Sequence, residues 1–432
     1  MVSPDQPFIP AKAIDEIADF LADPVAAADF PEHRLRFRND RAAAEIGLAT
    51  MSDDRWIDHF GRFQPFDGSL RQPLALRYHG HQFRSYNPQI GDGRGFLFAQ
   101  CRDGDGRLMD LGTKGSGTTP HSRFGDGRLT LKGAVREILA TEMLQALGVE
   151  TSRTLSVIET GERLVRGDEP SPTRSAVLVR LSHGHIRIGS FQRLATLGLT
   201  DELRRLTAYC LEHYFGEQDG PDAPQRLLAH TVRRTARLAA SYMAAGFVHG
   251  VLNTDNINIT GESFDYGPWR FAPGFDPDFT AAYFDERGLY SFGRQAEAIH
   301  WNLVQLAIAL NPICDSDALA AAIEPFGDHY VDALVERFLW RLGAASQGRD
   351  ADIARVQQIE RDLTDSGASI DRYFFDARER RDHSYLSNPE PCSMLIEEVE
   401  ALWAPIAADD DWSPLTAKIA AIRSMGEALR TA

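Results

Sequence analysis

The sequence predicts an α+β protein with two lobes, a β-rich N-terminal lobe and a helical C-terminal lobe. Short apolar runs separated by glycines and turns fill residues 61–190, whereas long amphipathic segments dominate residues 191–432. The length of 432 residues suits one large two-lobed unit. Residues 1–60 are expected to form a peripheral helical extension, because apolar residues recur at helical spacing between Pro10 and Ala22.

The individual elements follow from turn signals and from hydrophobic periodicity. Residues 103–106, Asp-Gly-Asp-Gly, supply a hairpin turn between two apolar runs and so predict a pair of neighbouring strands. Residues 131–147 place their apolar side chains on one stripe, which predicts a helix. The expected strands are residues 96–99, 108–111, 153–159 and 176–181. The expected helices of the C-terminal lobe are residues 203–214, 224–245, 294–310, 352–365 and 393–403.

Composition and charge argue against several classes of function. The net charge of −16 disfavours nucleic acid as a partner, because binding to phosphate backbones depends on Lys and Arg. The sequence contains no apolar run of the roughly 18 residues that a membrane span needs, and no signal peptide is visible. The cysteines, Cys101, Cys210, Cys314 and Cys392, form no C-x-x-C pair and are expected to be reduced thiols. We therefore expect a cytoplasmic protein without a membrane partner.

The most informative segment is residues 249–256, His-Gly-Val-Leu-Asn-Thr-Asp-Asn. Its histidine, leucine and asparagine match the catalytic loop of protein kinases, H-R-D-L-x-x-x-N. Val251 stands where a kinase has the aspartate that accepts the proton of the substrate hydroxyl. Nine residues after this segment, Asp265-Tyr266-Gly267 matches the metal-binding triplet D-F-G. The pattern predicts a bilobal protein-kinase-like fold that binds nucleotide and metal but lacks the usual base.

Asn256 and Asp265 are the candidate metal ligands. Mg²⁺ prefers oxygen ligands and commonly takes one or two protein groups together with phosphate oxygens, and Mn²⁺ is the alternative metal. Asp255, next to this site, is the candidate catalytic base. The plainer alternative is an Asx-rich turn without chemistry.

A second group of residues is expected to bind the phosphates of ATP. Gly91, Gly93 and Arg94 precede a strand, where glycines let backbone N–H groups approach phosphates and the arginine adds donors. Lys114 at a strand end and Glu137 on the following helix suit the ion pair with which kinases orient phosphates, and Glu142 is the competing partner.

Four further candidates complete this group. Asp126 and Gly127 lie in a Gly-Asp-Gly-Arg loop before the same helix, a position that favours anions. Arg180 and Arg187 are candidate phosphate clamps. The alternatives are a tight turn for the glycine-rich segments and a solvent-exposed side chain for Lys114 and the arginines.

Together these motifs resemble the selenoprotein O family, kinase-like protein adenylyltransferases also called the YdiU family. The resemblance spans roughly residues 70–310, on segments 78–83, 91–94, 113–115, 125–128, 136–137, 249–256, 265–267, 290–295 and 301–303. It implies that ATP binds in a flipped orientation and that AMP passes to Ser, Thr or Tyr hydroxyls of protein substrates. It also implies the following roles: ATP binding by Gly91, Gly93, Arg94, Lys114, Asp126, Gly127, Arg180 and Arg187, a base at Asp255, and metal ligation by Asn256 and Asp265.

The chain departs from this family near its C-terminus. Many members carry a cysteine or selenocysteine there, but no cysteine follows Cys392 in this sequence. Redox control through such a residue is therefore not expected. Two other functions remain open: a true kinase, which Val251 disfavours, and a non-catalytic nucleotide-binding scaffold, which the candidate metal ligands disfavour.

Overall fold

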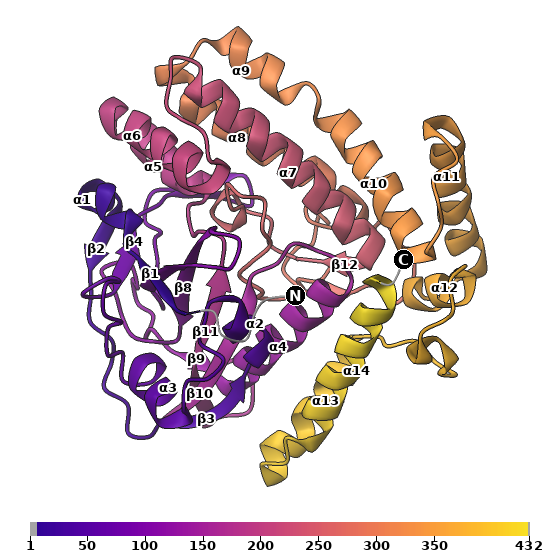
Figure 1. The fold of residues 1–432 in the computed structure, drawn as a ribbon, viewed down its shortest axis with the longest axis horizontal. Helices are drawn as coiled ribbons and strands as arrows, with labels where there is room; N and C mark the ends of the chain where they lie inside the picture. The colour runs from indigo at the N-terminus through magenta and orange to yellow at the C-terminus, as the bar shows by residue number, and fades with distance from the viewer. Residues whose placement is uncertain (1–6, 431–432) are drawn as a thin grey trace.

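Within residues 7–430, which this computed structural model describes, nine strands form one antiparallel sheet (Figure 1). The strands are β1 (Ile9–Ala11), β2 (Ala22–Pro24), β3 (Arg34–Arg38), β4 (Leu74–Leu76), β7 (Leu97–Arg102), β8 (Leu108–Lys114), β9 (Leu129–Thr130), β10 (Arg153–Leu164) and β11 (Thr173–Ser182). The main order is β2-β4-β7-β8-β11-β10-β3, with β1 paired to β7 and β9 paired to β11. The four strands expected from the sequence are confirmed as β7, β8, β10 and β11, which are adjacent in the sheet.

Helix α4 (Leu131–Ala146) packs against β10 and β11 and confirms the helix expected over residues 131–147. Thr130 caps its N-terminus, because the threonine hydroxyl accepts a hydrogen bond from the Gly133 N–H. Apolar side chains such as Val135 and Ile138 bury the helix in the main core. This packing carries Glu137 into the interior, where it is 2% exposed.

The structure corrects the expected helical extension over residues 1–60. Strands β1, β2 and β3 come from this segment and belong to the sheet, beside the short helices α1 (Ala18–Leu21), α2 (Asp40–Glu45) and α3 (Asp53–Phe60). The β3 sequence, Arg-Leu-Arg-Phe-Arg, alternates charged and apolar residues with the period of a strand. Residues 1–6 lie outside the described part of the chain. The domain boundaries near residues 60 and 190 stay predictions.

The second half of the chain is helical, as expected, and its longest helix is α7 (Ala223–Ala245). Gly246, with a φ of +68°, ends α7 in the left-handed conformation that glycine adopts without strain. The other helices are α5 (Ile188–Thr196), α6 (Thr200–Cys210), α8 (Gln295–Leu310), α9 (Ser316–Ile323), α10 (Phe326–Leu342), α11 (Arg349–Ser366), α12 (Ile370–Ala377), α13 (Ile396–Asp409) and α14 (Ser413–Arg430). All the expected helices are present. No helix among the described residues is long and apolar enough to cross a membrane.

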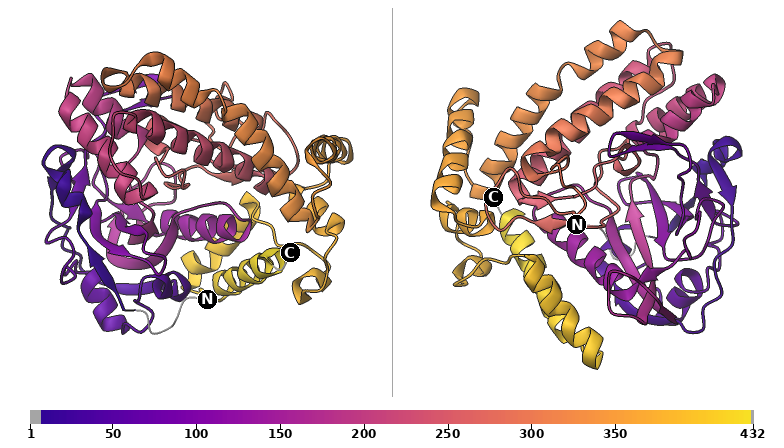
Figure 2. Two further views of the ribbon diagram at one scale, coloured as in Figure 1. Left: turned by 45° about the horizontal axis from the view of Figure 1, so that its top comes forward. Right: turned by 180° about the vertical axis from the view of Figure 1, so that it is seen from behind.

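The last two helices, α13 and α14, return to the N-terminal lobe and pack against α4 (Figure 2). Arg423 on α14 forms an ion pair with Glu142 on α4 at 2.6 Å. Gly426 lets the two helices approach closely, because a Cβ atom there would lie 3.1 Å from the side chain of Ala146. The end of the chain therefore supports the helix that carries Glu137.

A small two-stranded sheet joins the two ends of the loop that contains the catalytic-loop segment. Strand β12 (Phe247–Val248) pairs with β13 (Arg270–Phe271), so residues 249–269 form a loop between them. A hairpin of β5 (Gly80–Gln82) and β6 (Ser85–Asn87) contacts this loop from the other lobe. The first contact joins the two ends of the loop, and the second holds the loop against the β5–β6 hairpin.

Candidate active site

A cavity of about 680 Å³ lies between the large sheet and the catalytic-loop segment. Its wall comes from the loop before β7, the end of β8, residues 121–128, strand β11 and the loop between β12 and β13. The candidate residues that line it are Gly91, Gly93, Arg94, Lys114, Asp126, Gly127, Arg180, Arg187, Asp255, Asn256 and Asp265. The remaining candidate, Glu137, lies behind Lys114. The fold thus gathers the predicted site residues from both lobes around one cavity.

Lys114 connects the two lobes through a buried ion-pair network. Its ammonium group contacts the carboxylate of Glu137 and lies 2.8 Å from Oδ1 of Asp265. Lys114 is the last residue of β8, and both it and Glu137 are almost completely buried. Glu142, the competing partner, binds Arg423 and Asn39 instead. The pairing of Lys114 with Glu137 is therefore confirmed, and the alternative of a solvent-exposed Lys114 is wrong.

Asp265 adopts a backbone conformation that is rare for residues other than glycine. Its φ is +63°, in the left-handed region, where a side chain normally costs energy. Burial alone would raise the pKa of its carboxyl, but the charges of Lys114, Arg180 and Arg94 outweigh burial and hold this pKa well below its usual value. Asp265 therefore presents an ionised carboxylate in the cavity wall at neutral pH.

Side-chain hydrogen bonds order the catalytic-loop segment. His249 donates from Nε2 to the carbonyl of Phe264 at 3.0 Å, which joins the start of the segment to the residue before Asp265. Asn256 donates its amide N–H to the carbonyl of Val251 at 3.0 Å, which leaves its side-chain oxygen as the atom suited to a metal. Asn256 and Asp265 both line the cavity.

Asp255 is a buried carboxylate with unused hydrogen-bonding capacity. It is 8% exposed, and its Oδ1 has no hydrogen-bond partner among residues 7–430. Burial raises its pKa to about 6, although the nearby Arg187 acts in the opposite direction. Gly80 leaves room for the carboxylate, because a Cβ atom there would lie 3.0 Å from Oδ1. Such a carboxylate can accept a proton from a bound hydroxyl.

The two candidate arginines are buried in the cavity wall, so the alternative of surface arginines is wrong. The Arg187 guanidinium lies over the ring of Tyr78, 4.1 Å from its centroid, and donates to the Asp255 carbonyl at 3.2 Å. Nη1 of Arg180 lies 3.8 Å from Oδ1 of Asp265 and has no hydrogen-bond partner within the described chain. A buried guanidinium N–H without a partner is the kind of donor that a phosphate oxygen satisfies.

The glycines of the wall are required by close packing of the wall loops. A Cβ atom on Gly91 would lie 2.5 Å from the ring of His121, and one on Gly93 would lie 3.0 Å from the His121 carbonyl oxygen. Gly127 has a φ of +68°, and a Cβ atom there would lie 2.2 Å from the backbone of Gly117. These glycines shape the cavity whether or not their N–H groups also contact phosphate.

Asp126 lies at the exposed rim of the cavity. Its side chain accepts a hydrogen bond from the Arg128 N–H at 3.0 Å and forms an ion pair with Arg166 at 2.9 Å. Asp126 therefore acts as a turn residue, as the alternative interpretation proposed, and it also belongs to the cavity wall.

Comparisons with known proteins identify the family. Residues 10–389 match the model of a family described as protein adenylyltransferase SelO. The chain belongs to the SelO family. It is 44% identical to the protein nucleotidyltransferase YdiU of Synechococcus elongatus, over 98% of this chain and 96% of the relative. The corresponding protein of Synechocystis sp. is 45% identical, over 93% of this chain and 84% of the relative.

These matches confirm the expected family and enzyme class, since the SelO relatives carry the name of nucleotidyltransferases. Among solved structures, a rhoptry antigen kinase domain of Toxoplasma gondii aligns over 68% of this chain and 84% of that chain. The sequence identity is 11% and the TM-score is 0.28.

The donor set of this SelO member fits a nucleotide with one divalent cation. Among the described residues, no three His, Cys, Asp or Glu side chains form a metal-binding cluster. Two oxygen donors, Asn256 and Asp265, together with phosphate oxygens, suit Mg²⁺. The cations of Lys114, Arg180 and Arg187 suit the phosphates themselves.

The sequence interpretation missed several residues that support this site. Tyr78 lies under Arg187, although no role was assigned to it. Asn253 accepts hydrogen bonds from the Phe83 N–H at 3.0 Å and from the Tyr290 hydroxyl at 2.7 Å, which ties the catalytic loop to the β5–β6 hairpin. Asp110 could have been identified from the sequence, because a charged residue inside the apolar run Leu-Met-Asp-Leu needs a buried hydrogen-bond or ion-pair partner.

Proposed function

We propose that this SelO member transfers AMP from ATP to Ser, Thr or Tyr hydroxyl groups of proteins. The observation that carries the proposal is the buried Asp255 carboxylate beside the metal-ligand candidates, in a loop where Val251 replaces the kinase base. The family description, protein adenylyltransferase, supports the same reaction. A kinase would need an aspartate in place of Val251.

In the proposed reaction, the acceptor oxygen forms a bond to the α-phosphorus of ATP. The bond from that phosphorus to the oxygen that bridges to the β-phosphate breaks, and pyrophosphate leaves. Asp255 takes the proton of the acceptor hydroxyl. Because its pKa is raised to about 6, it is a stronger base than an exposed carboxylate and is still ionised at neutral pH.

Asn256 and Asp265 would hold Mg²⁺ or Mn²⁺, and the cation would supply positive charge to the phosphate oxygens when bound. Lys114, Arg180 and Arg187 hold fixed positive charges on the same cavity. These charges stabilise the negative charge that builds up on the phosphate groups during transfer. Glu137 keeps the Lys114 ammonium in place.

Two forms of labelled ATP test the proposal. Incubation of the protein with Mg²⁺ and α-labelled ATP is expected to label a protein acceptor, whereas γ-labelled ATP is expected to leave it unlabelled. Label from the γ-phosphate would instead support the kinase alternative. Tight ATP binding without transfer of either label would support the scaffold alternative. Intact-mass measurement of the chain itself distinguishes added AMP from added phosphate.

The Lys114–Glu137 pair gives a graded prediction. Lys114→Ala is expected to lower transfer by roughly 100-fold, because it removes a charge from the phosphates, whereas Glu137→Gln is expected to cost only about tenfold, because Glu137 acts through the lysine. Glu142→Gln is the comparison variant: it breaks an ion pair between the same helix and α14 without touching Lys114, and so measures how much loss comes from weaker support of the helix alone. A larger loss for Glu137→Gln than for Lys114→Ala would reverse the proposed roles. The measurement is the initial rate of AMP transfer at saturating ATP.

Thiol redox state is expected to change transfer less than about twofold. Cys101, Cys210 and Cys392 are buried, and burial raises the pKa of each thiol, to about 11 for Cys392. Reactive thiolates are therefore scarce at neutral pH. The measurement compares transfer with and without dithiothreitol after mild oxidation. A large, reversible gain on reduction would reveal a disulfide switch, with Cys392 as the first residue to test by substitution with serine.

A further inference from the structure

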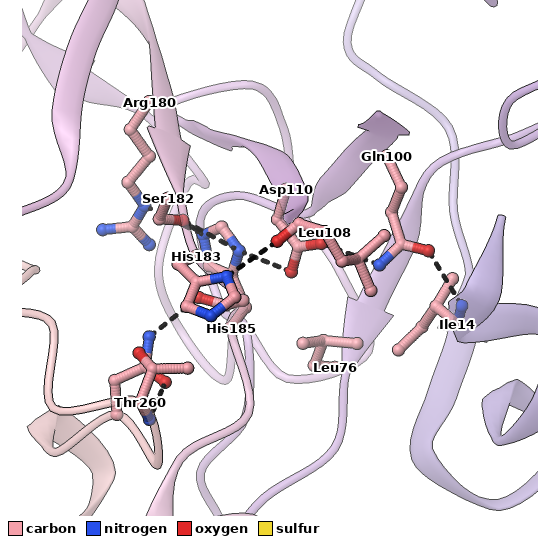
Figure 3. Close-up of polar contacts among 12 residues, drawn as sticks. Ile14, Leu76, Gln100, Leu108, Asp110, Arg180, Ser182, His183, His185 and Thr260 are labelled. Carbon is pink, nitrogen blue, oxygen red and sulfur yellow. Dashed lines mark hydrogen bonds and ion pairs between the residues drawn. The ribbon is translucent and has the colours of Figure 1, made fainter. Parts of the chain in front are cut away.

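A chain of buried polar groups runs from the cavity wall into the sheet (Figure 3). Nε of Arg180 donates to Nε2 of His185 at 3.2 Å, and Nδ1 of His185 lies 3.1 Å from a carboxylate oxygen of Asp110. The other oxygen of Asp110 accepts from the side-chain amide of Gln100 at 2.7 Å. Gln100 in turn accepts from the backbone N–H of Ile14 at 2.8 Å. Neither Asp110 nor His185 is among the residues to which the proposed function gives a role.

The donors and acceptors in this series of buried polar groups are compatible with only one protonation state of His185. A guanidinium group can only donate and a carboxylate can only accept. The imidazole must therefore be neutral, with its proton on Nδ1 facing Asp110 and its lone pair on Nε2 facing Arg180. Burial lowers the pKa of His185 and outweighs the hydrogen bond to Asp110, which raises it, and the charge of Arg180 adds to the lowering. The neutral ring is thus the stable form at physiological pH.

The sheet is shaped to hold this ring. Asp110 and Gly112 lie two residues apart on β8, so they face the same side of the sheet, and Gly112 is directly opposite Arg180 on β11. A Cβ atom on Gly112 would lie 2.4 Å from Nε2 of His185. Glycine is therefore required at this position for the ring to reach Arg180.

Because Nε of Arg180 binds His185, the terminal nitrogens of the guanidinium, Nη1 and Nη2, remain available to a ligand in the cavity. Nε is occupied by His185, while Nη1 is buried, lies 3.8 Å from Asp265 and has no hydrogen-bond partner within residues 7–430. We propose that Asp110 and His185 are positioning residues that orient the Arg180 guanidinium toward the phosphates of the nucleotide. This inference rests on the proposed function, because it takes a phosphate ester as the ligand of Arg180.

Calorimetric binding of ATP and of adenosine, both with Mg²⁺, tests the inference on the full-length protein. His185→Ala is expected to weaken ATP binding by roughly tenfold or more, because a freely rotating guanidinium makes weaker charge-assisted hydrogen bonds. Adenosine binding is expected to be unchanged, because adenosine has no phosphate. His185→Gln is expected to restore most of the ATP affinity, since its side-chain oxygen can accept from Nε of Arg180.

Two further variants separate positioning from a structural defect. His183→Ala is the matched control, because His183 is a buried neighbour whose ring contacts the Leu108 and Tyr214 carbonyls and no arginine. It is expected to bind ATP within about twofold of wild type. If His185→Ala fails to fold, His185→Asn replaces it, because asparagine can still reach Asp110 but is too short to reach Arg180.

A double-mutant cycle decides the inference. In the Arg180→Ala background, His185→Ala is expected to cause no further loss of ATP affinity, because its effect acts through the arginine. Additive losses, or an equal loss in His183→Ala, would overturn the positioning role. If wild type binds ATP and His185→Ala binds it equally well, this inference alone fails. If wild type binds no ATP, the proposed function fails with it.

Discussion

The Asp265→Ala variant is expected to lose metal-dependent transfer, with a fall of roughly a thousandfold or more. The substitution removes one of the two candidate oxygen ligands of the metal and the carboxylate that lies 2.8 Å from Lys114. Both changes weaken the charge arrangement around the phosphates. The measurement is transfer of α-label to protein over a series of Mg²⁺ concentrations.

Asp265→Asn separates the loss of the ligand from strain in the backbone. Alanine is unfavourable at the φ of +63°, whereas asparagine tolerates this region better than most residues. The asparagine variant is therefore expected to unfold at a temperature closer to wild type and still to lose transfer, because a neutral amide is a weaker metal ligand. Near-normal transfer by this variant at the Mg²⁺ concentration that saturates wild type would rule out Asp265 as a ligand.

Asp255→Asn is expected to lower kcat by roughly 100- to 10,000-fold, the usual range for loss of a general base. The substitution preserves the size of a side chain that is 8% exposed, so ATP affinity is expected to stay within about twofold of wild type. Rates from single-turnover transfer and affinities from ATP titration measure the two effects separately.

The two readouts assign Asp255 one of three roles. A loss of kcat alone supports a base. A parallel loss of ATP affinity would indicate that the Asp255 carboxylate instead helps to hold the nucleotide, through its charge attraction to Arg187. Retention of kcat would remove Asp255 from the chemistry.

The sequence was informative where a local pattern decides local structure. The glycine-containing turn at residues 103–106 and the apolar runs around it predicted the hairpin of β7 and β8. The apolar stripe over residues 131–147 predicted α4 with nearly the right ends. The segment 249–256 and Asp265 were predicted to lie close together because their spacing matches a known loop geometry, and Asp255, Asn256 and Asp265 line one cavity.

Long-range contacts could not be predicted in this way. Nothing in the pattern of α14 indicates that Arg423 would meet Glu142, which lies on another element 281 residues away in sequence. The strands β1 and β2 are three residues each, too short for periodicity to distinguish them from helix ends. The His185–Asp110 contact depends on strand register and on the missing side chain of Gly112, which only the assembled sheet reveals.

Protein synthesis proceeds from the N-terminus, so α4 leaves the ribosome long before α14 does. Until residues 413–430 emerge, the face of α4 that contacts α14, including Glu142 and Ala146, remains uncovered in the nascent chain. The helix that holds Glu137 against Lys114 therefore gains its full support only after residues 413–430 have been synthesised. A nascent chain that has not yet gained α14 therefore lacks part of the packing that supports Glu137 in the cavity wall.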